Sequence, residues 1–222
     1  MVNDRARTAL LLIDIQYDFL PGGALAVTGG EAILAPIREL LESCLFDCVV
    51  ATQDWHPAGH VSFASSHAGR TPFEVMLLHG REQVLWPDHC IAGTRGAALH
   101  DSLPLEHVDA IIRKGTDPKV DSYSGFRNNW DENGERPATG LAGYLRERGI
   151  KRAYVCGLAR DFCVRWSAED AADLGFEVAV IWDLTRSVNP AGDDVLRAAL
   201  DDKNVQVIDS KHLASTRQGM VL

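Results

Sequence analysis

Short apolar runs recur along the chain, and in each of them the residues on both alternating faces are apolar. A run of this kind is typical of a strand that is covered on both sides, as in a parallel sheet between two layers of helices. We therefore predict six strands, at residues 8–13, 47–52, 110–113, 152–156, 177–182 and 205–208.

Between these runs, apolar residues recur at the spacing of one helix face. Four segments have this pattern, at residues 31–44, 139–148, 161–174 and 193–200. Gly149 and Gly175 follow two of them, where glycine commonly ends a helix. The alternation of strands and helices predicts one three-layer α/β/α domain over residues 1–222, with a mainly parallel, Rossmann-like sheet of six strands.

Residues 55–99 interrupt this alternation with a stretch rich in His, Gly, Pro and Ser. A connection of this length inside a compact domain is usually functional. We therefore expect it to contribute side chains to a site.

Composition narrows the classes of function. The 222 residues are 46% hydrophobic, which is enough for one sizeable core. A formal net charge of −9 and the lack of a basic stripe argue against non-specific binding to nucleic acid or to an anionic membrane. The start of the chain does not resemble a signal peptide, and no stretch reaches the roughly 18 apolar residues of a spanning helix. We expect a cytoplasmic protein without a nucleic-acid or membrane partner.

Polar side chains follow the first four predicted strands directly. Asp14 ends the first strand, Asp54 and His56 follow the second, Lys114 follows the third, and the fourth leads into Cys163. In open parallel sheets, ligands bind beyond the carboxyl ends of the strands. A carboxylate, a candidate metal pair, an ammonium and a thiol are therefore expected to meet at one edge of the sheet.

Cys163 is the candidate nucleophile because it lies near the start of a predicted helix. The free N–H groups and the dipole of a helix N-terminus favour a thiolate, and the same N–H groups can receive an oxyanion. Asp14 offers a base and Lys114 a cation, which are what a nucleophilic thiol needs. Taken alone, Cys163 is more typical of a core helix residue, Lys114 of a solvated charge and Asp14 of a turn cap. Their joint placement at one sheet edge is what favours a site.

The other cysteines compete less well for this role. The total of five is odd and includes no CxxC pair, which favours reduced thiols over a disulfide framework. Cys156 falls inside an apolar strand, where a thiol is buried and inert. Cys90 follows His89 and is a candidate metal ligand, whereas Cys44 and Cys48 flank a helix-to-strand turn and look structural.

A metal site is predicted by a second group of residues. Asp54 and His56 are two residues apart, so in an extended segment both side chains point to the same side and can reach one ion. His89 can complete the set from the long 55–99 stretch. Two imidazoles and one carboxylate suit one divalent ion, zinc, iron or manganese. The residues that compete for a further ligand position are His60, Ser62, His67, His79 and Asp88.

Five segments of the chain carry a resemblance to a known family. They are LLIDIQYDFLPGGALAV (11–27), TQDWHPAGHVSFAS (52–65), LWPDHCIAGTRGA (85–97), RKGTDPKVDSYSGF (113–126) and VCGLARDFCV (155–164). In these segments the chain resembles the nicotinamidases (pyrazinamidases) of the isochorismatase-like cysteine hydrolases. The DWHP and WPDHC motifs are particular to the nicotinamidases, because they carry the metal site. Isochorismate-cleaving relatives lack the nucleophilic cysteine.

The resemblance implies a metal-dependent amidase that converts nicotinamide to nicotinate and ammonia through a cysteine thioester. It also implies activity on pyrazinamide, a place in NAD salvage and an assembly into homo-oligomers. In such an enzyme the catalytic triad is Asp14, Lys114 and Cys163. The metal ligands are Asp54, His56 and His89, with Ser62, His60 or water in a further position.

The resemblance further implies a ring pocket and an oxyanion hole. The pocket residues are Phe19, Leu25, Trp86, Tyr123 and Ala159. The N–H groups of Ala159 and Cys163 form the oxyanion hole, and the family has a non-proline cis peptide where this chain has Leu158–Ala159. Arg160 departs from the family pattern, which has a small or polar residue there.

Two alternatives remain at this stage. One is a related cysteine amidase that acts on another small amide or carbamoyl substrate, and the metal motif speaks against it. The other is a non-catalytic metal-binding or assembly protein, and the intact set of Asp14, Lys114 and Cys163 speaks against that.

Overall fold

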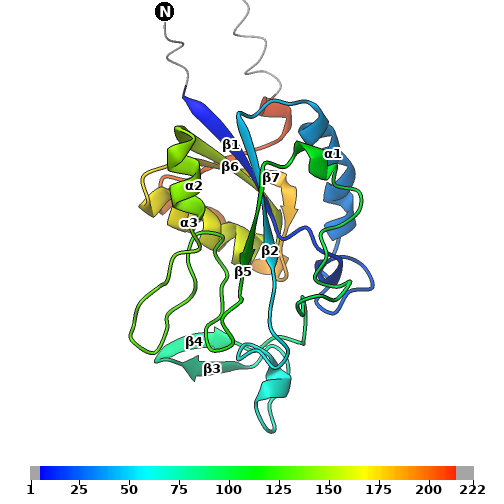
Figure 1. Cartoon of the computed structure of the whole chain (residues 1–222), viewed down its shortest axis with the longest axis vertical. Helices are drawn as coiled ribbons and strands as arrows, with labels where there is room; N and C mark the ends of the chain where they lie inside the picture. Colours follow the sequence, from blue (N-terminus) through cyan, green and yellow to red (C-terminus); the bar gives the residue numbers. More distant parts are fainter. Residues whose placement is uncertain (1–5, 214–222) are drawn as a thin grey trace, which may run out of the picture.

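A six-stranded sheet forms the middle layer of the molecule (Figure 1). The computed structural model describes residues 6–213, so the ends of the predicted 1–222 domain, residues 1–5 and 214–222, lie outside the described residues. Every pairing in this sheet is parallel, and the strand order is β5-β2-β1-β6-β7-β8. The strands are β1 (Arg7–Ile13), β2 (Cys48–Asp54), β5 (Ala110–Lys114), β6 (Ile150–Leu158), β7 (Glu177–Arg186) and β8 (Gln206–Ile208). The six predicted strands and their parallel arrangement are confirmed.

Helices cover both faces of the sheet (Figure 1). They are α1 (Leu34–Glu42), α2 (Leu141–Glu147), α3 (Arg165–Asp173) and α4 (Asp193–Asp202). Side chains of α1 pack in one core cluster, and side chains of α2, α3 and α4 pack in the other. The predicted three-layer α/β/α fold is therefore confirmed. Two helices begin later than predicted, since a 3-10 turn (Gly30–Ile33) precedes α1 and a π-helical turn (Arg160–Val164) precedes α3.

The central strand β1 shows why both of its faces are apolar. Leu10 and Leu12 pack into the cluster on the α1 side, and Leu11 and Ile13 pack into the cluster on the opposite side. All four side chains are fully buried, because successive residues of a strand point to opposite faces.

Strand β5 differs from the expectation of burial on both faces. It lies at the edge of the sheet, and Ile111 is 46% exposed. A run of four residues carries too little pattern to separate an edge strand from an interior one, which is why the sequence suggested burial.

The predicted long stretch of residues 55–99 contains an unpredicted hairpin. Strands β3 (Val75–Leu78) and β4 (Arg81–Val84) pair antiparallel beyond the carboxyl ends of the parallel strands (Figure 1). Their two-residue turn is His79–Gly80, with φ values of 50° and 75°. Positive φ at both positions is the mark of a type I′ hairpin turn, so this dipeptide was the missed signal.

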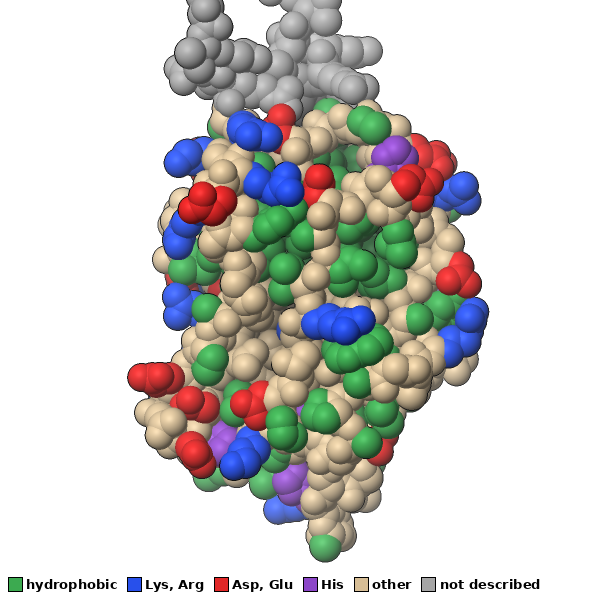
Figure 2. All heavy atoms as spheres, viewed as in Figure 1, with side chains coloured by type: hydrophobic (Ala, Val, Ile, Leu, Met, Phe, Trp, Pro, Cys, Tyr) green, Lys and Arg blue, Asp and Glu red, His purple; other side chains and the backbone are tan. Residues whose placement is uncertain are grey.

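Charged side chains are mixed on the face seen in Figure 2. Acidic and basic groups lie near one another around its rim, and apolar side chains lie between them. Among residues 6–213, no helix is both long and apolar enough to cross a membrane.

Candidate active site and metal site

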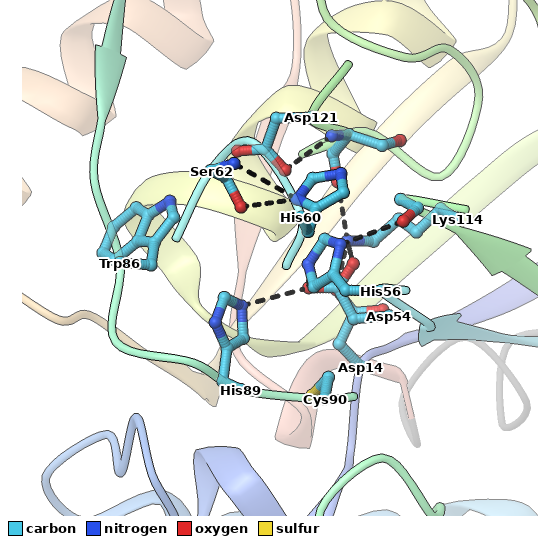
Figure 3. Close-up of polar contacts among 12 residues, drawn as sticks. Asp14, Asp54, His56, His60, Ser62, Trp86, His89, Cys90, Lys114 and Asp121 are labelled. Atoms are coloured by element: carbon cyan, nitrogen blue, oxygen red, sulfur yellow. Dashed lines mark hydrogen bonds and ion pairs between the residues drawn. The ribbon is translucent and has the colours of Figure 1, made fainter. Parts of the chain in front are cut away.

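The polar side chains predicted from the strand ends lie close together, and Figure 3 shows Asp14, Asp54, His56 and Lys114 beside one another. Asp54 and Cys163 line a cavity at this place. The space between its lining residues, counted together with the solvent at its mouth, is about 360 Å³. Its lining is Phe19, Leu25, Asp54, Trp86, His89, Asp121, Tyr123, Ala159, Phe162, Cys163 and Val188. All five residues predicted for the ring pocket are among them.

Lys114 lies at the centre of the buried polar groups. Its Nζ is 2.9 Å from Asp14 Oδ2, 2.8 Å from Asp54 Oδ1 and 3.5 Å from Cys163 Sγ. It also donates to the carbonyl of Ser122 at 2.9 Å. One ammonium therefore joins the predicted catalytic residues to the predicted metal ligands.

The protonation of these groups follows from burial and from their mutual charges. Burial opposes the charge of Lys114, but Asp14 and Asp54 outweigh it and hold the pKa of the ammonium well above its usual value. Burial raises the pKa of the Cys163 thiol well above its usual value, although Lys114 acts against this. Burial also raises the pKa of Asp14, and Lys114 opposes that shift. The resting state favoured by these shifts is a thiol beside a charged ammonium.

Asp14 is held in place by the neighbouring strand. It follows β1 with φ 47°, and its N–H donates to Thr52 Oγ1 at 3.1 Å. The Thr52 hydroxyl donates in turn to Asp14 Oδ1 at 2.6 Å. An Asp14 carboxylate oxygen also lies within 4.8 Å of the Cys163 sulfur. Thr52 thus orients the carboxylate through Oδ1, and Oδ2 contacts the Lys114 ammonium.

Asp54, His56 and His89 bring their ligand atoms together, as Figure 3 shows. These atoms lie within 4.8 Å of one another, and all three residues are buried. His56 donates from Nδ1 to the carbonyl of Gly115 at 2.9 Å, and His89 donates from Nδ1 to that of Pro87 at 2.8 Å. Both rings therefore turn Nε2 toward Asp54 Oδ2, at 3.3 and 3.6 Å. Backbone carbonyls that fix the ring tautomer are typical of metal-binding histidines, so the set fits a divalent ion.

The ionisation of Asp54 also fits this role. Burial raises its pKa, but Lys114 and His56 outweigh that effect and hold the pKa well below its usual value. A carboxylate that stays charged is a ready ligand for a cation.

His60 lies beside these ligands but has both ring nitrogens engaged. Its Nε2 donates to the carbonyl of Asp117 at 2.9 Å, so Nδ1 accepts the Ser62 hydroxyl hydrogen at 2.8 Å (Figure 3). Burial lowers the pKa of His60, and His56 adds to this, which agrees with a neutral ring. Of the two side chains, Ser62 keeps oxygen lone pairs free for a further ligand position.

The other competitors have different partners. His67 and His79 each bond through Nε2 to a backbone carbonyl, and Asp88 accepts the Ser65 hydroxyl hydrogen. Cys90 is fully buried, and it belongs to none of the ligand clusters found among residues 6–213.

The side chain of Gln16 positions Asp54 by bonding to its backbone, and the sequence did not predict this role. The Gln16 side chain donates to the carbonyl of Asp54 and accepts its N–H, both at 2.8 Å. Asp121, Phe162 and Val188 were missed as cavity residues. Val188 lies two residues after β7, which runs to Arg186 and so extends four residues beyond the predicted strand of residues 177–182. The end of the predicted strand therefore gave no signal for it.

The thiol lies in the turn between β6 and α3. The Leu158–Ala159 peptide is cis, where the family resemblance implied it. The π-helical turn Arg160–Val164 then carries Cys163 to the cavity. Cys156 lies further back in β6 and is fully buried, and burial raises the pKa of its thiol.

Comparison with known proteins agrees with this geometry. The isochorismatase domain family matches residues 8–212. The nicotinamidase of Acinetobacter baylyi is 47% identical over 184 residues, which cover 83% of each chain. The nicotinamidase of Escherichia coli is 43% identical over 195 residues, covering 87% of this chain and 89% of that one.

Solved structures show the same fold. The nicotinamidase/pyrazinamidase of Acinetobacter baumannii has a TM-score of 0.88 at 41% identity, covering 95% of this chain and 99% of that one. The yeast nicotinamidase bound to the inhibitor nicotinaldehyde has a TM-score of 0.85 at 30% identity, and the match covers 91% of this chain and 100% of that one. The pyrazinamidase of Pyrococcus horikoshii in complex with zinc has a TM-score of 0.73 at 33% identity, and the match covers 91% of this chain and 99% of that one. The chain therefore belongs to the nicotinamidase/pyrazinamidase family of isochorismatase-like hydrolases and is an amide-hydrolysing enzyme.

Proposed function

We propose that this enzyme hydrolyses nicotinamide to nicotinate and ammonia through a thioester on Cys163, in the salvage of NAD. The observation that carries the proposal is that two of the predicted metal ligands, Asp54 and His89, line the same cavity as the predicted nucleophile Cys163. The third ligand, His56, has its ligand atom within 4.8 Å of theirs. A flat heteroaromatic amide has two ends to recognise, a ring nitrogen and a carboxamide. The cavity offers one group of residues for each.

The aromatic side chains would hold the ring. Trp86 and Tyr123 meet edge to face at 6.2 Å between ring centroids, and Phe19 lies 5.6 Å from the His89 ring. A divalent ion held by Asp54, His56 and His89 would supply Lewis acidity toward the ring nitrogen. Orientation of this kind can remove several kcal/mol, on the order of 7 or more, from a reaction barrier.

Asp14 would act as the base. It takes the Cys163 thiol proton while the sulfur attacks the amide carbon and the carbonyl electron pair moves to oxygen. The raised pKa of the thiol makes this transfer necessary, because a free thiolate is scarce at neutral pH. The Lys114 ammonium, 3.5 Å from the sulfur, would stabilise the charge that develops.

The N–H groups of Ala159 and Cys163 would receive the oxyanion. When the carbonyl re-forms, the C–N bond breaks, and Asp14 returns its proton to the departing nitrogen, which leaves as ammonia. A water then attacks the thioester with Asp14 again as base, and nicotinate and the free thiol result.

Replacing Cys163 with Ala tests the nucleophile. We expect ammonia release from nicotinamide to be abolished while metal content and nicotinate binding are retained. Cys156→Ala is the matched control, since this thiol is buried outside the cavity, and it should keep both turnover and metal. Turnover by the Cys163→Ala protein would refute the proposed mechanism.

The wild-type substrate range tests the reaction itself. We expect ammonia from nicotinamide and from pyrazinamide, and none from aliphatic carbamoyl compounds, because these lack the ring nitrogen. The reverse preference would instead support the related cysteine amidase. Elemental analysis of the same protein identifies the metal among zinc, iron and manganese.

A further inference from the structure

Arg160 is a buried cation that faces away from the cavity. It is 7% exposed and follows Ala159 directly, three residues before Cys163. It is absent from the cavity lining, and the cation that touches the thiol is Lys114. Arg160 therefore does not contact the substrate cavity, and its buried charge is bonded elsewhere.

All three guanidinium nitrogens of Arg160 are bonded to the segment that runs from the end of β7 into α4. Nε donates to Thr185 Oγ1 at 2.7 Å, and one terminal nitrogen donates to the carbonyls of Thr185 and Trp182 at 2.7 and 3.1 Å. The other terminal nitrogen donates to Asp193, the first residue of α4. The guanidinium also lies 4.0 Å from the Trp182 ring centroid. Such a planar fork fixes a side chain more tightly than a single ion pair does.

Asp161 makes a second attachment to the same segment. Its two carboxylate oxygens accept the N–H groups of Val188 and Asn189, at 2.9 and 2.8 Å. Val188 lines the cavity, so this segment is both a cavity wall and the anchor of the turn. Arg160 and Asp161 thus attach the start of the turn to one support from two sides.

We propose that Arg160 is a positioning residue, which holds the Ala159–Cys163 turn so that its sulfur and its two N–H groups keep the geometry of the tetrahedral intermediate. This inference rests on the proposed function. Binding of a planar ligand in the ring pocket does not need this geometry, whereas reaction at the carbonyl carbon does. Loss of Arg160 should therefore affect the two differently.

The test compares a planar ligand with one that becomes tetrahedral. Nicotinate binds without a covalent bond. Nicotinaldehyde adds the thiol, with the sulfur bonding to the aldehyde carbon and the thiol proton passing to its oxygen. We expect Arg160→Met to lower kcat about 10- to 100-fold and to weaken the binding of nicotinaldehyde by a similar factor. The KM for nicotinamide and the Kd of nicotinate should change less than about 3-fold.

Arg197→Met is the matched control. The Arg197 guanidinium stacks on the same Trp182 ring, 3.7 Å from its centroid, but Arg197 is exposed and lies within α4. This variant should keep wild-type values for all four quantities. Asp193→Asn removes the charge that Arg160 meets while keeping its shape, and it should show a smaller loss of the same pattern.

Two results would overturn the inference. One is a folded Arg160→Met protein with wild-type kcat and nicotinaldehyde affinity. The other is an equal loss for nicotinate and nicotinaldehyde, which would mean general damage to the cavity. If Arg160→Met does not fold, Asp193→Asn decides by the same two criteria. A wild-type protein without activity on nicotinamide would refute the proposed function, and the aldehyde affinities would still report on the turn.

Discussion

At the scale of single residues, the site depends on one ammonium shared by two carboxylates. Lys114 touches Asp14, the proposed base, and Asp54, a proposed metal ligand. Asp54 in turn gives Oδ1 to Lys114 and Oδ2 to the two histidines. The base and the metal site are therefore coupled through direct contacts, and a change in either charge affects the other.

The Thr52 hydroxyl gives a test of how the proposed base is tuned. Its hydrogen bond lowers the pKa of Asp14, opposing the increase caused by burial. Thr52→Val removes the donor and destabilises the charged carboxylate, so the pKa should rise. Since the reaction needs Asp14 ionised, the acid limb of the kcat/KM profile should move to higher pH. On that limb, kcat/KM at a given pH should fall about 10-fold.

Two controls accompany this measurement. Metal content is followed at each pH, because acid also protonates histidine ligands. Thr8→Val, a threonine near the start of β1 and away from the cavity, should leave the profile unchanged. An acid limb that stays in place or moves to lower pH in Thr52→Val would contradict the assignment of Asp14.

At the scale of elements, the sequence predicted what depends on local pattern. The six strands and the residues at their ends were readable, since burial on both faces and the end of each run are local properties. The hairpin of β3 and β4 was missed because its Val75 and Leu77 are exposed, so no buried face marks it. Gln16 was missed because it acts on the backbone of Asp54 across two strands, a contact that only the register creates.

Gly157 tests the packing of β6 against β1 beside the site. Its φ is 117°, and a Cβ added there would overlap the backbone of Ile13. Gly157→Ala should lower the free energy of unfolding by at least about 2 kcal/mol, measured by urea denaturation. Gly143→Ala is the control, since Gly143 lies in α2 with open space around it, and it should raise stability by about 0.5–1 kcal/mol. Equal free energies of unfolding for the two variants would contradict the tight packing of β6 against β1 at Gly157.

At the scale of the whole molecule, the metal site would join the sheet to the long 55–99 stretch. Asp54 ends β2, whereas His89 lies beyond the hairpin of β3 and β4. An ion bound to both stabilises the folded chain in proportion to its occupancy, because the unfolded chain does not form the site.

Removal of the metal should therefore lower the melting temperature. At a free metal concentration about 100 times the Kd, the stabilisation is about 2.7 kcal/mol, or roughly 5–10 °C for a chain of this size. Calorimetry with and without a chelator measures it, and adding back the metal should restore the transition. In His89→Ala, which should hold less metal, the chelator should change little. A chelator effect as large in His89→Ala as in the wild type would remove His89 from the ligand set.

The strand order has a consequence for the chain as it is made. β1 pairs on one side with β2 and on the other with β6, which follows about 140 residues later. Asp14, the three proposed ligands and Lys114 all leave the ribosome before Cys163, which comes 49 residues after Lys114. A nascent chain can therefore assemble the metal cage against an open edge of β1 while it still has no nucleophile. The thiol follows shortly after β6, the strand that covers this edge of β1, so the nucleophile is made only once the strands on both sides of Asp14 exist.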